Sequence, residues 1–187
     1  MNGKSEQILE EEREEIIRYG MKRGKVIIVS TLITILIGYF LGIPRQSIIF
    51  WFSLSILRRY AGGYHADSEE KCYITSFAMV IISLFCIEML NYKKEIGIIL
   101  QTISLIIILF WAPMENKNNT LDDIEKKKYG IRTRIIVIGE YAISCLLYEM
   151  GYISEGFSIG VANFVVGLML IVGYMKMVKE KNMKKHC

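Results

Sequence analysis

Proline is scarce in this sequence, and charge is missing over long stretches. The 187 residues include two prolines, and 52% of the residues are hydrophobic, which excludes collagen-like and disordered chains. No Lys, Arg, Asp or Glu occurs in Val26–Pro44, Gln46–Leu57, Ile96–Met114 or Phe157–Met175. Because a helix that crosses a bilayer needs about 18 or more apolar residues, we expect an integral membrane protein.

Cysteine and histidine are also few, with four and two copies. No two cysteines have the C-x-x-C spacing of a zinc site, and no phosphate-binding P-loop or nucleic-acid-binding pattern occurs. His65, Asp67 and Cys72 could supply three metal ligands, but a fourth ligand is not evident. We therefore expect no metal, no cofactor and no nucleic-acid partner.

Six apolar segments follow one another along the chain. They are Val26–Ile43, Gln46–Leu57, Cys72–Leu90, Ile96–Met114, Ile135–Met150 and Phe157–Met175. Gln46–Leu57 is short, and Ile135–Met150 contains Glu140 and Glu149. The sequence predicts an all-α polytopic membrane bundle of about six transmembrane or partly re-entrant helices. Four spans with two partial helices are the alternative.

Positive charge is distributed unevenly between the connections. Of the 23 Lys and Arg residues, 20 lie before Val26, in segments 58–71 and 115–134, or after Met175. The positive-inside rule therefore predicts that both termini are cytoplasmic. Residues 5–19 predict an N-terminal amphipathic helix. We expect a cytoplasmic arm over 1–25, a membrane domain over 26–175 and a basic cytoplasmic tail over 176–187.

A polar loop before Cys72 contains the best candidate for chemistry. Asp67 and Glu70 have capping-box spacing, so Cys72 would lie near the N-terminus of a helix, where a thiolate is stabilised. Gly62 and Gly63 would let the loop fold His65 over Cys72 and direct backbone N–H groups at an oxyanion. Cys72 and His65 are thus a nucleophile–base candidate, and a chance histidine in an ordinary loop is the alternative.

Two segments resemble a known family. Arg59–Ala66 (RYAGGYHA), followed by Cys72-Tyr73, resembles the signature of the accessory gene regulator protein B (AgrB) family, bacterial membrane cysteine endopeptidases of peptide quorum sensing. Trp111–Asn118 (WAPMENKN) is similar to the stretch after that family's fourth span. The resemblance implies a multi-pass protein of the bacterial cell membrane, a homodimer, that cleaves an AgrD-like propeptide. Cys72 would be the nucleophile and His65 the general base, and the product would be a thiolactone or lactone autoinducing peptide.

Other polar residues are candidates for supporting roles. Glu115 or Asn116 could orient His65, although each could equally be an ordinary loop residue. The resemblance implies an acidic propeptide tail, which Arg58, Arg59, Lys126, Lys127 and Lys128 could bind, while the lysines could also serve only as topology anchors. Glu140 inside a span favours a hydrogen bond between helices over a proton relay. A non-catalytic membrane adaptor and a small transporter are the alternative functions.

Overall fold

The computed structural model describes residues 3–62, 69–90, 93–114 and 122–185, with the backbone alone at several positions in the first half of α1, at the end of α6 and over residues 69–73. All elements of regular structure in these ranges are helices, which confirms the all-α prediction. They are α1 (Gly3–Phe40), α2 (Pro44–Ala61), α3 (Glu69–Leu90), α4 (Lys94–Trp111), α5 (Asp123–Glu149) and α6 (Ile153–Lys185).

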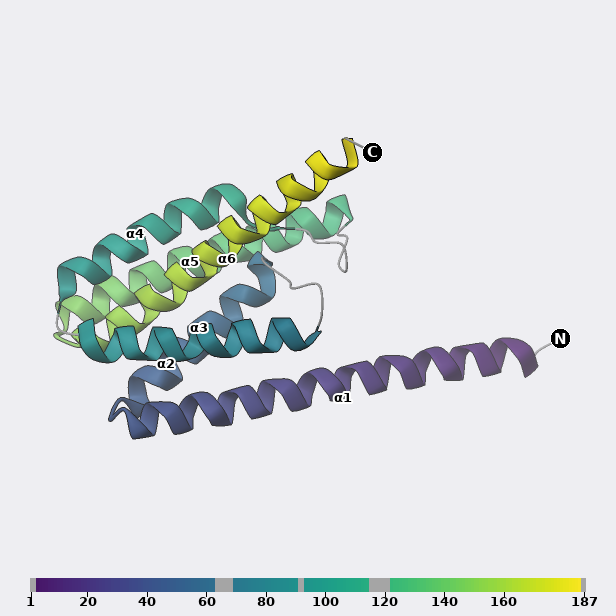
Figure 1. The fold of residues 1–187 in the computed structure, drawn as a ribbon, viewed down its shortest axis with the longest axis horizontal. Helices are drawn as coiled ribbons and strands as arrows, with labels where there is room; N and C mark the ends of the chain where they lie inside the picture. Colours follow the sequence, from purple (N-terminus) through teal and green to yellow (C-terminus); the bar gives the residue numbers. More distant parts are fainter. Residues whose placement is uncertain (1–2, 63–68, 91–92, 115–121, 186–187) are drawn as a thin grey trace.

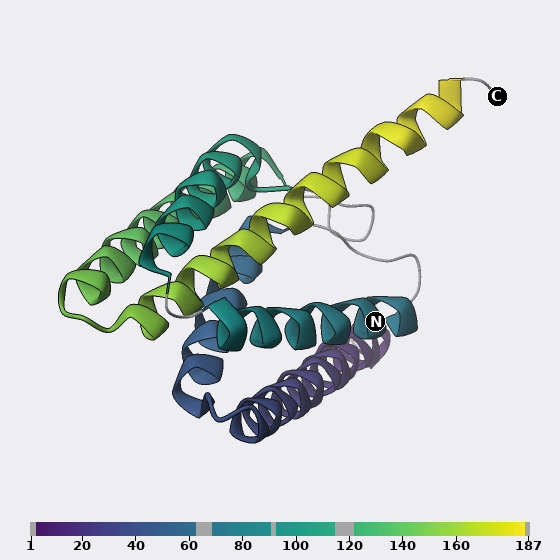
Figure 2. The same cartoon turned by 60° about the vertical axis from the view of Figure 1, so that its left-hand side comes forward.

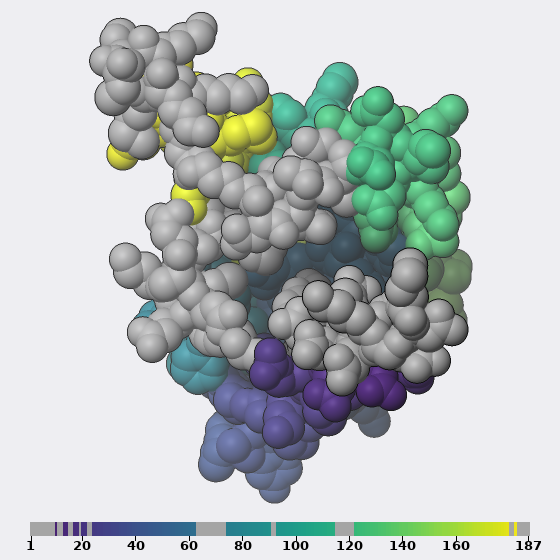
Figure 3. Space-filling view, turned by 90° about the vertical axis from the view of Figure 1, so that its right-hand side faces the viewer, coloured from purple at the N-terminus to yellow at the C-terminus, as the bar shows by residue number. Residues whose placement is uncertain are grey.

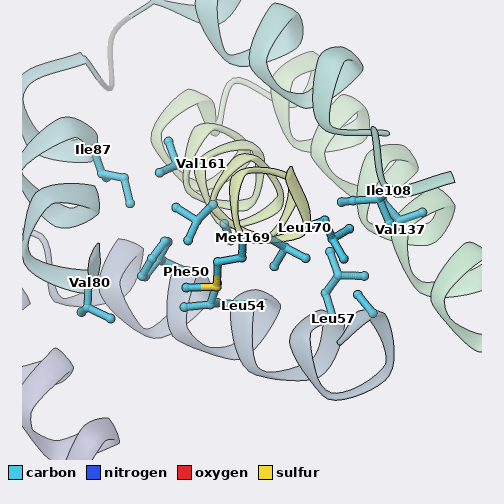
Figure 4. Packing of buried hydrophobic residues seen from close by; sticks show 14 of the residues in the cluster. Phe50, Leu54, Leu57, Val80, Ile87, Ile108, Val137, Val161, Met169 and Leu170 are labelled. Atoms are coloured by element: carbon cyan, nitrogen blue, oxygen red, sulfur yellow. The ribbon is translucent and has the colours of Figure 1, made fainter. Parts of the chain in front are cut away.

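Helix α6 is the centre of the bundle. It packs against α2, α3, α4 and α5, whereas α1 packs against α2 and α3 at the periphery (Figures 1 and 2). Figure 4 shows Met169 and Leu170 of α6 facing Leu54 and Leu57 of α2 in the apolar core. This arrangement buries α6 from most sides and leaves the outer faces of the other helices uncovered.

The uncovered faces are apolar. Phe40 of α1, Met89 of α3 and Phe110 of α4 are 78%, 74% and 83% exposed. Soluble monomers rarely expose large contiguous apolar patches, so such faces are suited to contact with lipid. The bundle is therefore consistent with a membrane helical bundle.

The apolar lengths of the helices differ. Among the described residues, Lys94–Trp111 and Ile153–Lys179 are long and apolar enough to cross a membrane, and Gly24–Phe40 and Ile74–Leu90 are shorter apolar stretches. These four stretches coincide with the four long segments expected from the sequence. Helices α2 and α5 fall outside this set, yet each runs from one side of the bundle to the other (Figure 1), so the choice between six spans and four spans with two partial helices stays a prediction.

The ends of the helices divide the molecule into two sides. The N-terminus of α1, the C-terminus of α6, the end of α2 and the beginnings of α3 and α5 lie on the right in Figure 1. The α1–α2 and α5–α6 turns and the end of α3 lie on the opposite side. Helix α1 runs through residue 25 and α6 through residue 176, so both expected domain boundaries fall within helices, and the division itself stays a prediction.

Candidate functional site

The ends of α2 and α4 are joined through their backbones. The N–H of Met114 donates a hydrogen bond of 3.0 Å to the carbonyl oxygen of Ala61, and Gly62 and Met114 form an isolated parallel bridge. Ala61 and Met114 are both buried. Pro113 lies against Gly130 of α5, where a methyl group on Gly130 would be 3.2 Å from the proline ring. Three helices therefore support this junction.

Gly62 is the residue that allows the two segments to meet. Its φ is +72° and its ψ is −143°, a backbone conformation that is almost confined to glycine. A methyl group at this position would also collide with the carbonyl oxygen of Met114. The structure thus assigns Gly62 a backbone role, while the oxyanion role expected for Gly62 and Gly63 stays a prediction.

The junction links the two segments that the sequence analysis singled out. The chain that leads to Gly63 and His65 leaves from Gly62, and the chain that leads to Glu115 and Asn116 leaves from Met114. These four candidate residues lie outside the described residues. The two segments nevertheless start from one point, although they are separated in the sequence by two helices.

Cys72 is the fourth residue of α3, and its side chain is outside the described part of the chain. Ser76 follows it by one helical turn, so the two residues share one face of the helix. The Nη1 atom of Arg58, in the last turn of α2, donates a hydrogen bond of 3.4 Å to the hydroxyl of Ser76. The face of α3 that contains Ser76 is therefore turned towards the end of α2.

Basic side chains gather at the end of the bundle where α2 ends and α5 begins. Lys126, Lys127 and Lys128 are exposed in the first turns of α5, and Arg59 is exposed at the end of α2. Arg58 instead contacts Ser76. Figure 3 looks onto this end and shows α5 on one side of it and α1 on the other.

The structure adds an aromatic contact that the sequence analysis did not identify. The guanidinium carbon of Arg132 lies 5.6 Å from the centre of the Tyr60 ring, and the rings of Tyr60 and Tyr129 are 6.0 Å apart. This cluster connects the end of α2 to the second and third turns of α5. Tyr60 lies within the RYAGGYHA motif, and this position in the motif is the sequence feature that could have pointed to it.

Comparisons with known proteins agree on one family. A family model described as "Accessory gene regulator B" matches residues 3–175. The chain is 27% identical over 177 residues to "Putative AgrB-like protein" of Clostridium perfringens (strain SM101 / Type A), which covers 91% of this chain and 82% of the relative. It is 33% identical over 108 residues to "Accessory gene regulator protein B" of Staphylococcus aureus (strain Newman). That match covers 57% of this chain and 54% of the relative. No solved structure matches the chain.

Proposed function

This chain belongs to the accessory gene regulator B family of quorum-sensing membrane proteins, and we propose on this premise that it is a cysteine endopeptidase acting on an AgrD-like propeptide. The observation that carries the proposal is the hydrogen bond from Met114 to Ala61, with the bridge at Gly62. It brings the starts of the two motif segments together at the end of the bundle where α3 begins.

The proposed reaction starts with His65 taking the proton of the Cys72 thiol. The thiolate attacks the scissile carbonyl carbon, the C–N bond breaks, and His65 returns the proton to the departing amine. The N-terminal fragment is then held on Cys72 as a thioester. A thiol or hydroxyl of that fragment loses its proton to His65 and attacks the thioester carbonyl, which closes a thiolactone or lactone ring and releases the Cys72 thiolate, and this thiolate takes the proton back from His65. No water is consumed, so the site must exclude it.

Two features of the bundle support this assignment. Cys72 lies at the fourth position of α3, where the positive end of the helix dipole favours a thiolate. Arg58 holds the adjacent turn through Ser76. The N–H of Gly62 itself donates to the carbonyl oxygen of Arg58 at 3.3 Å, so in this proposal the oxyanion hole draws on the backbone N–H groups that follow Gly62. In this proposal Glu115 or Asn116 orients His65, because that segment starts at the residue bonded to Ala61.

Positive charge provides the proposed contact with the rest of the substrate. Arg58, Arg59 and Lys126 to Lys128 stand at the same end as the start of α3. An acidic propeptide tail would be attracted to them, with Arg binding carboxylates in a fork geometry. We propose that this end and both termini face the cytoplasm of a bacterial cell, and that the protein acts as a homodimer.

The test is intact-protein mass spectrometry of the purified chain mixed with AgrD-type propeptides. We expect a hydroxylamine-labile adduct of the N-terminal fragment, or a free cyclic product where ring closure is fast. Cys72→Ala should abolish both. Cys86→Ala is the matched control, because Cys86 lies on the same helix at an exposed position far from its beginning, and it should retain full activity.

Two outcomes would contradict the proposal. If Cys72→Ala still cleaves the propeptide, the nucleophile is another group. If the wild-type chain gives neither adduct nor cleaved peptide across propeptides of varied sequence, the non-catalytic adaptor becomes the better description. A loss of function that follows Glu140→Gln while Cys72→Ala has no effect would favour the small transporter.

A further inference from the structure

A group of unpaired polar atoms lies inside the bundle, away from the site at its end. The side chains belong to Ser53 of α2, Glu140 of α5 and Asn163 of α6, and the Glu140 carboxyl lies beside the other two. Ser53 is 4% exposed and Asn163 is fully buried. Within the described residues, the Ser53 Oγ, the Glu140 Oε2 and both polar atoms of the Asn163 amide lack any hydrogen-bond partner.

Most polar groups next to this cluster are paired, although the Tyr148 hydroxyl of α5 is a further buried atom without a partner. Gln101 of α4 donates from Nε2 to the backbone carbonyl of Glu140 at 3.2 Å, and Ser144 donates to the Gln101 Oε1. Tyr141 of α5 pairs with Thr102 of α4. Buried polar atoms are nearly always paired, and an unpaired set marks a place where a water or an ion belongs.

Charge decides between these two occupants. The stretches of α2, α4 and α6 that surround Glu140 are parts of Gln46–Leu57, Ile96–Met114 and Phe157–Met175, which contain no charged residue. Arg58 of α2 is engaged with Ser76, and Arg134 is the nearest basic residue along α5, more than one turn away. A water molecule alone would leave the carboxylate charge uncompensated in an apolar region, which is very unfavourable.

We propose that Ser53, Glu140 and Asn163 form an intramembrane site for a monovalent cation, either a proton or a sodium ion. The Glu140 Oε2, the Ser53 Oγ and the Asn163 Oδ1 are hard oxygen donors supplied by three helices, which suits such a cation. A proton on Glu140 would be donated to the Asn163 Oδ1, and the Asn163 amide N–H groups could then donate to the Ser53 Oγ. Either cation neutralises the carboxylate and gives the unpaired atoms partners.

The test uses dicyclohexylcarbodiimide, which modifies protonated carboxyl groups in apolar surroundings, on the full chain in lipid nanodiscs. Peptide mass spectrometry measures labelling of Glu140 relative to Glu88, an exposed carboxyl near the end of α3. For a bound proton, we expect Glu140 labelling to fall about tenfold per pH unit above its midpoint. For sodium, labelling should fall as NaCl replaces choline chloride. Labelling that follows neither variable, or that is absent from Glu140, would overturn the proposal.

A second measurement guards against poor access of the reagent. The unfolding temperature of the wild-type chain should depend on pH or on sodium concentration more strongly than that of Glu140→Gln, because a cation bound only to the folded state stabilises it. Equal responses of the two proteins would contradict the proposal. Cys72→Ala should behave as the wild type in both measurements. The proposals of a cation site and of a peptidase can therefore be tested independently of each other.

Discussion

A single methyl group at Gly62 tests the backbone junction between α2 and α4. In Gly62→Ala the side chain meets the carbonyl oxygen of Met114, and the positive φ is strained. A shift of about 1 Å in the two attached segments would lower cleavage on the order of 100-fold. The rate of propeptide cleavage in detergent measures the effect.

Gly42→Ala is the matched control. Gly42 also has a positive φ, of 74°, but a methyl group there meets nothing within 4 Å, and it lies at the opposite end of the bundle. We expect this variant to keep most of its cleavage activity. If both variants lose activity equally, backbone strain rather than the Gly62–Met114 contact explains the loss.

At this scale the sequence singled out two segments but did not indicate how they meet. The motifs around Gly62 and Met114 were both recognised, but their contact is a backbone hydrogen bond between distant segments, and no side-chain pattern encodes it. The capping box that the structure describes is another example. It joins Asp122 and Glu125, and the N–H of Asp122 donates to the Glu125 carboxylate at 3.4 Å. The D-x-x-E spacing of these two residues is present in the sequence, but the sequence analysis did not interpret it as a helix start.

Close packing of helices α4 and α6 depends on the absence of side chains. A methyl group on Gly160 of α6 would lie 3.2 Å from the carbonyl oxygen of Gly97 on α4. We expect Gly160→Val to force the two helices apart and to destabilise the fold by about 1–3 kcal/mol. Thermal unfolding monitored by tryptophan fluorescence should show a lower midpoint.

Gly139→Val on α5 provides the comparison, because a methyl group at Gly139 meets nothing within 4 Å. Both substitutions add the same side chain to a helix and have the same intrinsic helix propensity. The midpoint for Gly139→Val should stay near that of the wild type. An equal drop in both variants would mean that propensity, and not helix packing, sets the cost.

The sequence predicted where the helices are apolar more closely than where they begin. The expected Cys72–Leu90 and the observed α3 both end at Leu90, but α5 begins at Asp123 rather than near Ile135, and α6 continues to Lys185. Hydropathy reports which turns suit lipid, whereas Lys and Glu continue a helix well in water. A search for apolar segments therefore missed the charged turns of α5 and α6, whereas those of α1 include the helix expected over residues 5–19.

The orientation of the whole molecule is testable by chemical labelling. Arg45 at the start of α2 and Lys127 near the start of α5 are exposed at opposite ends of the bundle. In a chain whose four native cysteines are changed to serine, a membrane-impermeant maleimide should label Arg45→Cys in intact cells. Lys127→Cys should react only in inverted vesicles, because the end rich in Lys and Arg is expected to face the cytoplasm. The reverse pattern would show that the predicted orientation is wrong.

The hydrogen bond between Ala61 and Met114 also determines when the junction can form during synthesis of the chain. Met114 is synthesised about 50 positions after Ala61, a delay of roughly 3–10 s at about 5–20 residues per second. Until α3 and α4 have left the ribosome, the end of α2 has no partner for its carbonyl group. A nascent chain that already contains Cys72 is therefore incomplete at the junction, and the proposed propeptide processing would have to wait for a chain that is more than half made.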